Sequence, residues 1–223
     1  MLITIANLLD LAALNQVRDL LSTLRWKDGA ETAGPTARDV KHNFQADLTS
    51  RTGAKARDIL SKAIEAHPVL QAAAQPARFS KLLISKTEQG GGYGLHVDNA
   101  FMPIGDDRLR TDLSFTLFLS DPDEHEGGEL QIEHAGQSMR LKPNAGDLVL
   151  YPSTSLHQVN AVSSGTRLVC VGWIESRIRR ADDRETLFDL INLKAELDAH
   201  HHPQSAEMLM LSKTIANLLR RFS

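Results

Sequence analysis

The sequence predicts a mainly β protein, with its strands arranged as a sandwich or barrel and with α-helices at both ends of the chain. Between 78 and 178, short runs of branched and aromatic residues alternate with turn sequences such as Gly90-Gly91-Gly92 and Asp121-Pro122-Asp123. Before and after this stretch, apolar residues recur at helical spacing. A chain of 223 residues, 42% of them hydrophobic, can bury the core of one globular unit.

The amino-terminal part of the chain is expected to be helical, and Asn7 can cap the first helix. The apolar face of this helix would be formed by Leu8, Leu11, Val17 and Leu21. The segment from Trp26 to Pro35 is then expected to be a loop. A second helix is expected from about Ala54 to His67, where Pro68 would break it, and helical structure would resume before Pro76.

The β part of the chain is expected to begin near Arg78. Strands are expected at 79–85, 112–119, 129–133, 138–141, 147–151, 157–162 and 167–174. Helical spacing returns after Arg180, and a final helix is expected from Ser205. We therefore divide the chain into an amino-terminal helical region packed on the core (1–77), a β domain (78–178) and a carboxy-terminal helical region (179–223).

Composition narrows the possible partners and the cellular location. The formal charge of -3 gives no electrostatic reason to expect nucleic acid or an anionic membrane as partner. Cys170 is the only cysteine, so no intrachain disulfide can form, and its apolar neighbours predict a small buried strand residue. The leucine-rich start has no basic leader, and no apolar run approaches the roughly 18 residues that span a bilayer. We expect a cytoplasmic protein.

Three residues form a candidate metal site. In an extended strand, His96 and Asp98 project from the same face while Val97 points the other way. Such a pair alone occurs by chance in many proteins, but His157, at the start of a distant expected strand, can supply a third ligand. Two histidines and one carboxylate leave three positions open on an octahedral metal, as in non-haem iron(II) oxygenases. Catalytic zinc, the rival metal, usually keeps a single open position.

Arg167 is the candidate binding residue for a second ligand. It lies on the expected strand after His157, in otherwise apolar surroundings. A buried arginine needs an anion, and a guanidinium group can bind the distal carboxylate of 2-oxoglutarate with two parallel hydrogen bonds. The alternative, an ion pair with a protein carboxylate at a strand end, would be preferred without the upstream metal ligands.

The sequence resembles the bacterial PKHD-type hydroxylases, which are relatives of the prolyl 4-hydroxylase catalytic domain. The residues that carry the resemblance are Tyr93 to Ala100, Arg110 to Ser114, Gly127 to Leu130, Gly146 to Ser153, Leu156-His157 and Gly165 to Arg167. It extends into Arg184 to Leu190 and more weakly into both terminal helical regions, and so covers nearly the whole chain. The resemblance implies a double-stranded β-helix (jelly-roll) core, iron(II), 2-oxoglutarate and ascorbate as reductant.

The resemblance also implies roles for individual residues. His96, Asp98 and His157 match the iron ligands of the family, and Arg167 matches its 2-oxoglutarate arginine. Tyr93 stands where related enzymes place a tyrosine near the cosubstrate, although an aromatic residue that fills the barrel mouth is an equal alternative. The β domain would then be the dioxygenase domain.

The activity implied is hydroxylation of an unidentified small-molecule or protein substrate, using oxygen and converting 2-oxoglutarate to succinate. Two other readings stay open: a non-catalytic sensor of metal or 2-oxoglutarate, and a cupin-like zinc hydrolase or isomerase. The segments Gly90 to Gly94 and Asn99 to Arg110 border the ligands and are expected to be mobile lids. The terminal helices could form a homodimer or cover the barrel.

Several other polar residues are expected to have no role in catalysis or metal binding. The tract His200-His201-His202 should be a solvated link between two helices. His125 and His134 flank the Gly127-Gly128 turn and could reach a substrate, although most histidines in such loops are merely exposed, and exposure is expected here. Asp147 should satisfy backbone donors in a turn.

Overall fold

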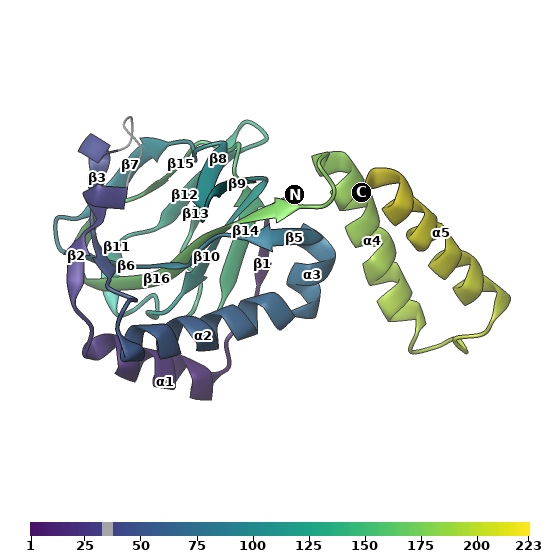
Figure 1. Cartoon of the computed structure of the whole chain (residues 1–223), viewed down its shortest axis with the longest axis horizontal. Coiled ribbons are helices and arrows are strands. Elements are labelled where there is room, and N and C mark those ends of the chain that lie inside the picture. The colour runs from purple at the N-terminus through teal and green to yellow at the C-terminus, as the bar shows by residue number, and fades with distance from the viewer. Residues whose placement is uncertain (33–37) are drawn as a thin grey trace.

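The computed structural model describes residues 1–32 and 38–223, which form two main antiparallel β-sheets with helices around them (Figure 1). The larger sheet has the strand order β1-β14-β10-β16-β6-β4-β2, and β5 and β11 pair with opposite ends of the long strand β16. Its strands are β1 (Ile3–Ile5), β2 (Trp26–Asp28), β4 (Phe44–Ala46), β5 (Pro76–Phe79), β6 (Leu83–Glu88), β10 (Leu113–Phe118), β11 (His125–Gly127), β14 (Leu148–Pro152) and β16 (Val162–Ser176).

The smaller sheet forms the opposite wall of the barrel and has the order β13-β12-β15-β7-β3. Its strands are β3 (Lys41–His42), β7 (Gly92–His96), β12 (Leu130–His134), β13 (Gln137–Leu141) and β15 (His157–Val159). This is the expected mainly β architecture. The amino-terminal 77 residues contribute strands to both sheets, in addition to the helices expected there.

Strand β10 shows how the larger sheet is buried on both faces. Leu113, Phe115 and Leu117 belong to the core that the sheet shares with the amino-terminal helices. Phe118 belongs to a second core, which contains Ile132 of the smaller sheet. Because side chains alternate between the two faces of a strand, one face packs against helices and the other looks into the barrel.

Helices α1 (Leu11–Ser22) and α2 (Arg51–Ala66) pack on the outer face of the larger sheet (Figure 1). The cap expected at Asn7 was wrong, because Asp10 caps α1 with a bond of 2.8 Å from Ala13 N to Asp10 Oδ1. Asn7 instead lies in the preceding turn, and its N–H donates to Asp147 Oδ1 at 2.8 Å. The predicted role of Asp147, accepting from a backbone donor, is therefore confirmed.

The carboxy-terminal helices form a hairpin at the end of β16, beside the barrel (Figure 1). Helix α4 (Ala181–Leu197) contacts α3 (Pro68–Ala74), and α5 (Ala206–Phe222) packs on α4. Buried Arg184 anchors the first turn of α4, since its Nη1 donates to the Ile178 and Arg179 carbonyls at 2.7 and 2.9 Å. The histidine tract lies in the exposed turn between the two helices, as expected.

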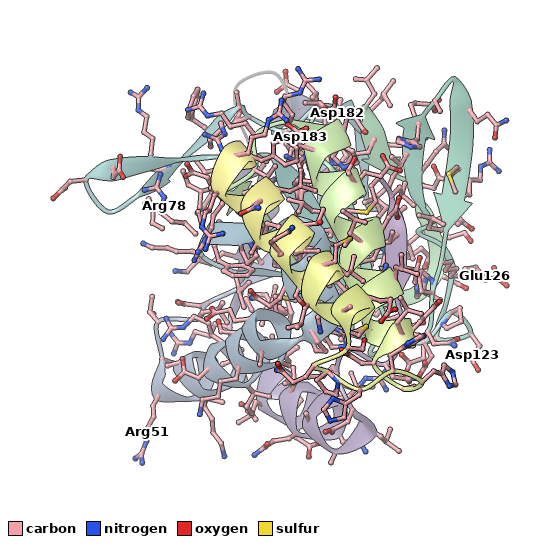
Figure 2. The ribbon with its side chains drawn as sticks, turned by 90° about the vertical axis from the view of Figure 1, so that its right-hand side faces the viewer. Arg51, Arg78, Asp123, Glu126, Asp182 and Asp183 are labelled. Atoms are coloured by element: carbon pink, nitrogen blue, oxygen red, sulfur yellow. The ribbon has the colours of Figure 1, made fainter. Side chains whose placement is uncertain are left out.

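Regular structure occurs in two segments for which the sequence predicted none, the expected lid at 99–110 and the expected loop from Trp26. Residues 99–110 include a hairpin of β8 (Phe101–Ile104) and β9 (Asp107–Arg110), which stands out from the body of the molecule near Arg78 (Figure 2). Arg78 holds the hairpin to the larger sheet, because its guanidinium bonds both Asp107 and Glu175. The expected loop from Trp26 to Pro35 contains β2 and a 3-10 helix, Gly29–Thr32, and its remainder at 33–35 lies outside the described residues.

The strand expected at 79–85 proved to be two strands, β5 and β6, because residues 80–82 between them leave the regular pairing with β16. Cys170 is a buried residue of β16, as predicted. Within the described part of the chain, none of the helices has the length and apolar character needed to cross a bilayer.

Candidate active site

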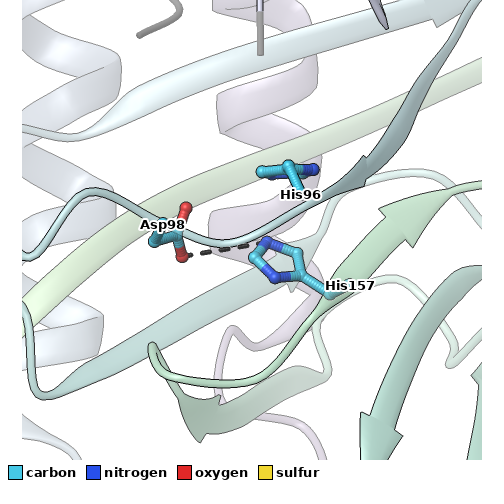
Figure 3. A group of neighbouring side chains, drawn as sticks. All are labelled: His96, Asp98 and His157. Carbon is cyan, nitrogen blue, oxygen red and sulfur yellow. Dashed lines mark ion pairs between the residues drawn. The ribbon is translucent and has the colours of Figure 1, made fainter. Parts of the chain in front are cut away.

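Two strands of the smaller sheet bring the distant histidines together. β15 pairs with β7, and in this register His157 lies directly opposite His96. Their ring centroids are 4.2 Å apart, and Asp98 follows just after the end of β7. One potential ligand atom from each of the three side chains lies within 4.8 Å of the other two (Figure 3). The three side chains are therefore placed to share one metal ion.

Backbone hydrogen bonds fix the tautomer and orientation of both imidazole rings. His96 Nδ1 lies 2.7 Å from the Gly94 carbonyl oxygen, and His157 Nδ1 lies 3.0 Å from that of Ser155. A carbonyl oxygen can only accept, so each Nδ1 carries the proton and donates it. In a neutral ring with this tautomer, the lone pair is on Nε2. This is the arrangement typical of metal-binding histidines, in which the other ring nitrogen fixes the tautomer and the ring orientation.

Asp98 is held by a serine from the opposite wall, and a second serine contacts the first. Ser114 Oγ donates to Asp98 Oδ2 at 2.6 Å, and Ser114 Oγ lies 2.7 Å from Ser153 Oγ. The same Oδ2 lies 3.7 Å from His157 Nε2, and the side chain of Asp98 is only 9% exposed. The carboxylate is thus oriented and largely shielded from solvent.

His96 is kept neutral by its surroundings. Burial, followed by the charge of His157, lowers the pKa of His96 to about 4. Burial has this direction because it disfavours the charged imidazolium. At neutral pH the ring can therefore bind a metal ion without first losing a proton.

Tyr93 supports one of the candidate ligands. Its ring stacks on that of His96, with centroids 3.6 Å apart and an interplanar angle of 19°. Burial, and then the charge of Asp98, raises the pKa of Tyr93 to about 12, so the hydroxyl remains a donor at neutral pH. Tyr93 also lines the cavity described next. This position is compatible with both expected roles of Tyr93, a hydrogen bond to a cosubstrate and an aromatic side chain that fills the mouth of the barrel.

A cavity of about 270 Å³ between the sheets contains all three candidate metal ligands and extends to Arg167 of β16. Arg167 is 2% exposed, and its Nε is buried without a hydrogen-bond partner among the described residues. Burial lowers the pKa of Arg167 to about 10, which leaves the guanidinium charged at neutral pH. A buried cation with an unused donor is costly unless an anion binds it. A carboxylate in the cavity would supply that anion.

The turn at Gly127-Gly128 makes room for Arg167. A Cβ atom on Gly128 would lie 3.0 Å from Arg167 Cδ and 3.1 Å from His125 Nδ1. The prediction that His125 is exposed was wrong, since the residue is 4% exposed. Its strand, β11, pairs with β16, where His125 lies opposite Gly165. This pairing, which the sequence alone does not reveal, turns the imidazole inward.

Sequence reasoning did not single out four residues that line the cavity, namely Lys41, Ser114, Tyr151 and Trp173. The sequence could have pointed to Ser114, because a polar side chain in the buried and mostly apolar strand Leu113–Phe118 costs free energy unless it forms a hydrogen bond. Tyr151, whose ring lies edge-on to His157 at 5.1 Å, stands within a motif that had been noted only as a whole. No local sequence pattern marks Lys41 as a site residue, because only the pairing of β3 with β7 brings it to the cavity.

The donor set fits iron(II). Two imidazole nitrogens and one carboxylate oxygen on one face leave three positions open, which suits a metal that must bind a chelating cosubstrate and oxygen. The buried cation Arg167 provides the counterion that a dicarboxylate needs. A β-barrel with these two features defines the class of 2-oxoglutarate-dependent iron(II) oxygenases.

Known proteins agree with this class. Residues 82–175 match the model of the 2OG-Fe(II) oxygenase superfamily. A PKHD-type hydroxylase from Hyphomonas neptunium (strain ATCC 15444) is 52% identical over 222 residues, which cover 100% of this chain and 99% of that relative. A PKHD-type hydroxylase from Synechococcus elongatus (strain ATCC 33912 / PCC 7942 / FACHB-805) is 48% identical over 223 residues, covering 100% of both.

The fold is also found in solved structures. A prolyl hydroxylase from Trichoplax adhaerens, solved with a peptide fragment of the hypoxia inducible factor oxygen degradation domain, matches with a TM-score of 0.59. The match covers 78% of this chain and 83% of that one at 16% identity, a level that supports the fold alone. The expected jelly-roll core is thereby confirmed.

The chain belongs to the PKHD-type hydroxylases. It is an iron(II)- and 2-oxoglutarate-dependent hydroxylase, as the resemblance of its motifs implied.

Proposed function

We propose that His96, Asp98 and His157 hold the catalytic iron(II) and that Arg167 binds the distal carboxylate of 2-oxoglutarate, with Tyr93 beside the cosubstrate. The observation that carries the proposal is the convergence of three ligand atoms within 4.8 Å, in a cavity that also contains a buried arginine. The ligands alone would suit several metals. The additional cation favours a metal that works with a dicarboxylate.

Iron(II), when bound with 2-oxoglutarate and oxygen, supplies the oxidant that hydroxylates a C–H bond, while 2-oxoglutarate becomes succinate and carbon dioxide. The tasks of the protein are positioning and exclusion of water. His96 and His157 present their Nε2 atoms, and Ser114 orients the carboxylate of Asp98. Arg167 orients the cosubstrate through its fixed fork of donors.

Apolar side chains from both sheets line the cavity beside these groups, including Leu130, Val159 and Val169. They keep bulk water away from the reacting atoms, and the low dielectric that results strengthens each charge interaction. The segment Asn99 to Arg110 is proposed as the lid that opens and closes this space. Most of the other expected lid, Gly90 to Gly94, belongs instead to β7, which pairs with β15 on one side and β3 on the other.

The remaining assignments are also proposals. Ascorbate would act as reductant, and the substrate would be a small molecule or a protein, not nucleic acid, in keeping with the net charge of -3. The single free and buried cysteine suits a cytoplasmic enzyme. The helical hairpin of α4 and α5 is the proposed surface for a homodimer. Residues 78–178 would be the dioxygenase domain.

The test is iron-dependent formation of succinate from 2-oxoglutarate, measured together with metal content. His96→Ala and Asp98→Ala should abolish both succinate formation and stoichiometric iron binding. His134→Ala removes an imidazole from β12 of the same sheet and should leave both unchanged. Normal iron content and turnover in either ligand variant would refute the assignment, and iron binding without any turnover by the wild type would favour a sensor.

A further inference from the structure

The wall of the cavity contains a buried tyrosine that the proposed function does not use. Tyr151, on β14, is 4% exposed and lines the cavity together with the candidate metal ligands and Arg167. Its ring lies edge-on to that of His157, with the ring centroids 5.1 Å apart. Because burying a hydroxyl group costs free energy, tyrosine is less favourable here than phenylalanine unless the hydroxyl forms a hydrogen bond.

Tyr151 also belongs to the group of side chains that surrounds Arg167. It is part of the second core, which contains Phe118 and Val169. The guanidinium group of Arg167 lies over the ring of Phe118, with Cζ 5.4 Å from the ring centroid. Val169 is two residues beyond Arg167 on β16, so both side chains are on the same face of that strand. Tyr151 therefore borders the metal site with its ring and shares a packed core with the neighbours of the buried cation.

Charges from both ends of the cavity act on the Tyr151 hydroxyl. Burial, and then the charge of Asp98, raise the pKa of Tyr151 well above its ordinary value, whereas a hydrogen bond from Thr116 and the charge of Arg167 lower it. The phenol therefore keeps its proton at neutral pH. Since Thr116 can donate to the hydroxyl oxygen, the proton of Tyr151 is available to an acceptor in the cavity.

The distal carboxylate of 2-oxoglutarate is an acceptor that fits this donor. An ionised carboxylate has about four lone-pair sites, and the fork of a guanidinium group occupies two of them, so a further donor can bond the same group. A neutral hydroxyl adds such a bond without adding charge to a buried pair. It also fixes the carboxylate from a second direction, because Tyr151 projects from β14 and Arg167 from β16.

We propose that Tyr151 is a cosubstrate-binding residue, whose hydroxyl donates a hydrogen bond to the distal carboxylate of 2-oxoglutarate beside Arg167. The inference rests on the proposed function, since it takes the binding of that carboxylate at Arg167 as given. Tyr151 would thereby contribute to specificity, because it favours a 2-oxo acid with a second acid group over a 2-oxo acid that lacks one.

Titration calorimetry with two 2-oxo acids tests the assignment. The protein is loaded with manganese(II) in place of iron(II), so that binding is measured without turnover, and is titrated with 2-oxoglutarate and with pyruvate. Pyruvate has the same keto acid end but no distal carboxylate. Tyr151→Phe keeps the aromatic ring and should weaken binding of 2-oxoglutarate by about 10-fold to 100-fold, as is typical when a hydrogen bond to a charged group is lost. Its affinity for pyruvate should equal that of the wild type.

Two further variants complete the comparison. Arg167→Met should weaken binding of 2-oxoglutarate at least as much as Tyr151→Phe does, again without an effect on pyruvate. Thr4→Val removes a hydroxyl from an exposed position of β1 in the same sheet and should bind both acids like the wild type. Equal affinity for pyruvate in all four proteins would also show that the metal site is intact in each of them.

Two results would overturn the inference. One is a wild-type affinity for 2-oxoglutarate in Tyr151→Phe. The other is an equal loss of affinity for both acids in that variant, because the hydroxyl would then serve the keto acid end or the metal site. Failure of the proposed function is distinguishable, since Arg167→Met would in that case keep the wild-type affinity for 2-oxoglutarate.

Discussion

Ser114 donates a hydrogen bond of 2.6 Å to Asp98 Oδ2, and this bond joins the two walls of the barrel. Ser114 belongs to the larger sheet, whereas Asp98 follows a strand of the smaller one. The orientation of the carboxylate therefore depends on both sheets being in register. The candidate metal site is consequently a property of the closed barrel and not of the His96-Val97-Asp98 segment alone.

Removing this hydroxyl should weaken metal binding. In Ser114→Ala the carboxylate loses its orienting donor, and iron(II) or manganese(II) affinity should fall by about 10-fold to 100-fold, as is typical when a partner of a metal ligand is lost. Competition against a fluorescent chelator measures the change. Ser138→Ala, at an exposed position of β13, is the matched control and should keep wild-type affinity. Equal affinities for all three proteins would contradict the role of Ser114.

Arg167 should affect cosubstrate binding and stability in opposite ways. Arg167→Met should raise the KM for 2-oxoglutarate by about 100-fold or more, because a charge-assisted bidentate pair is lost, and should leave metal affinity unchanged. In urea titrations without ligand, the same variant should be more stable than the wild type by roughly 1–3 kcal/mol, because a buried guanidinium with an unsatisfied donor is removed. Arg140→Met, on the exposed face of β13, should change neither quantity. A wild-type KM in Arg167→Met would rule out the assignment.

Gly128 and Gly136 form a matched pair, with φ of +70° and +77°, both in the left-handed region. Alanine at either position is strained, so each substitution should cost about 1 kcal/mol or more of stability. Only Gly128→Ala should raise the KM for 2-oxoglutarate, because the new Cβ would lie 3.0 Å from Arg167 Cδ. A Cβ added at position 136 would have no neighbouring atom within 4 Å. Steady-state kinetics of the two variants check this. A raised KM in both, or in neither, would contradict it.

Stability of the metal-free protein should fall as the medium is acidified. The folded pKa of His96, about 4, is below its ordinary value of 6.5. Between these two pH values the unfolded chain binds a proton that the folded chain does not, so stability is lost as the pH falls through this window and is constant above it. Urea titrations with chelator from pH 7.5 to 4 should show a weaker dependence in His96→Gln than in the wild type. His200→Gln, in the exposed turn between α4 and α5, should match the wild type.

The sequence predicted the fold best where the residues of a strand are by themselves sufficient to identify it. Runs of branched and aromatic residues predicted strands at β10, β14 and β16, and turn residues marked most of their ends. It predicted least where an element is short and stabilised only by its neighbours. The three residues of β11 became a strand because β16 extends beside them. In the hairpin of β8 and β9, Pro103 interrupts the apolar run of β8, and β9 is mostly polar, so neither strand was predicted.

The sequence by itself determined that His96 and Asp98 share a face, since residues two apart in an extended strand always do. It also indicated a third ligand at His157 and an anion-binding group at Arg167. Only the tertiary structure decided that His157 lies opposite His96, that Ser114 holds Asp98, and that Lys41 lies beside Tyr93. The physical reason is that side-chain direction follows from the backbone of one strand. The identity of the neighbouring strand, by contrast, depends on how the whole chain buries its apolar surface.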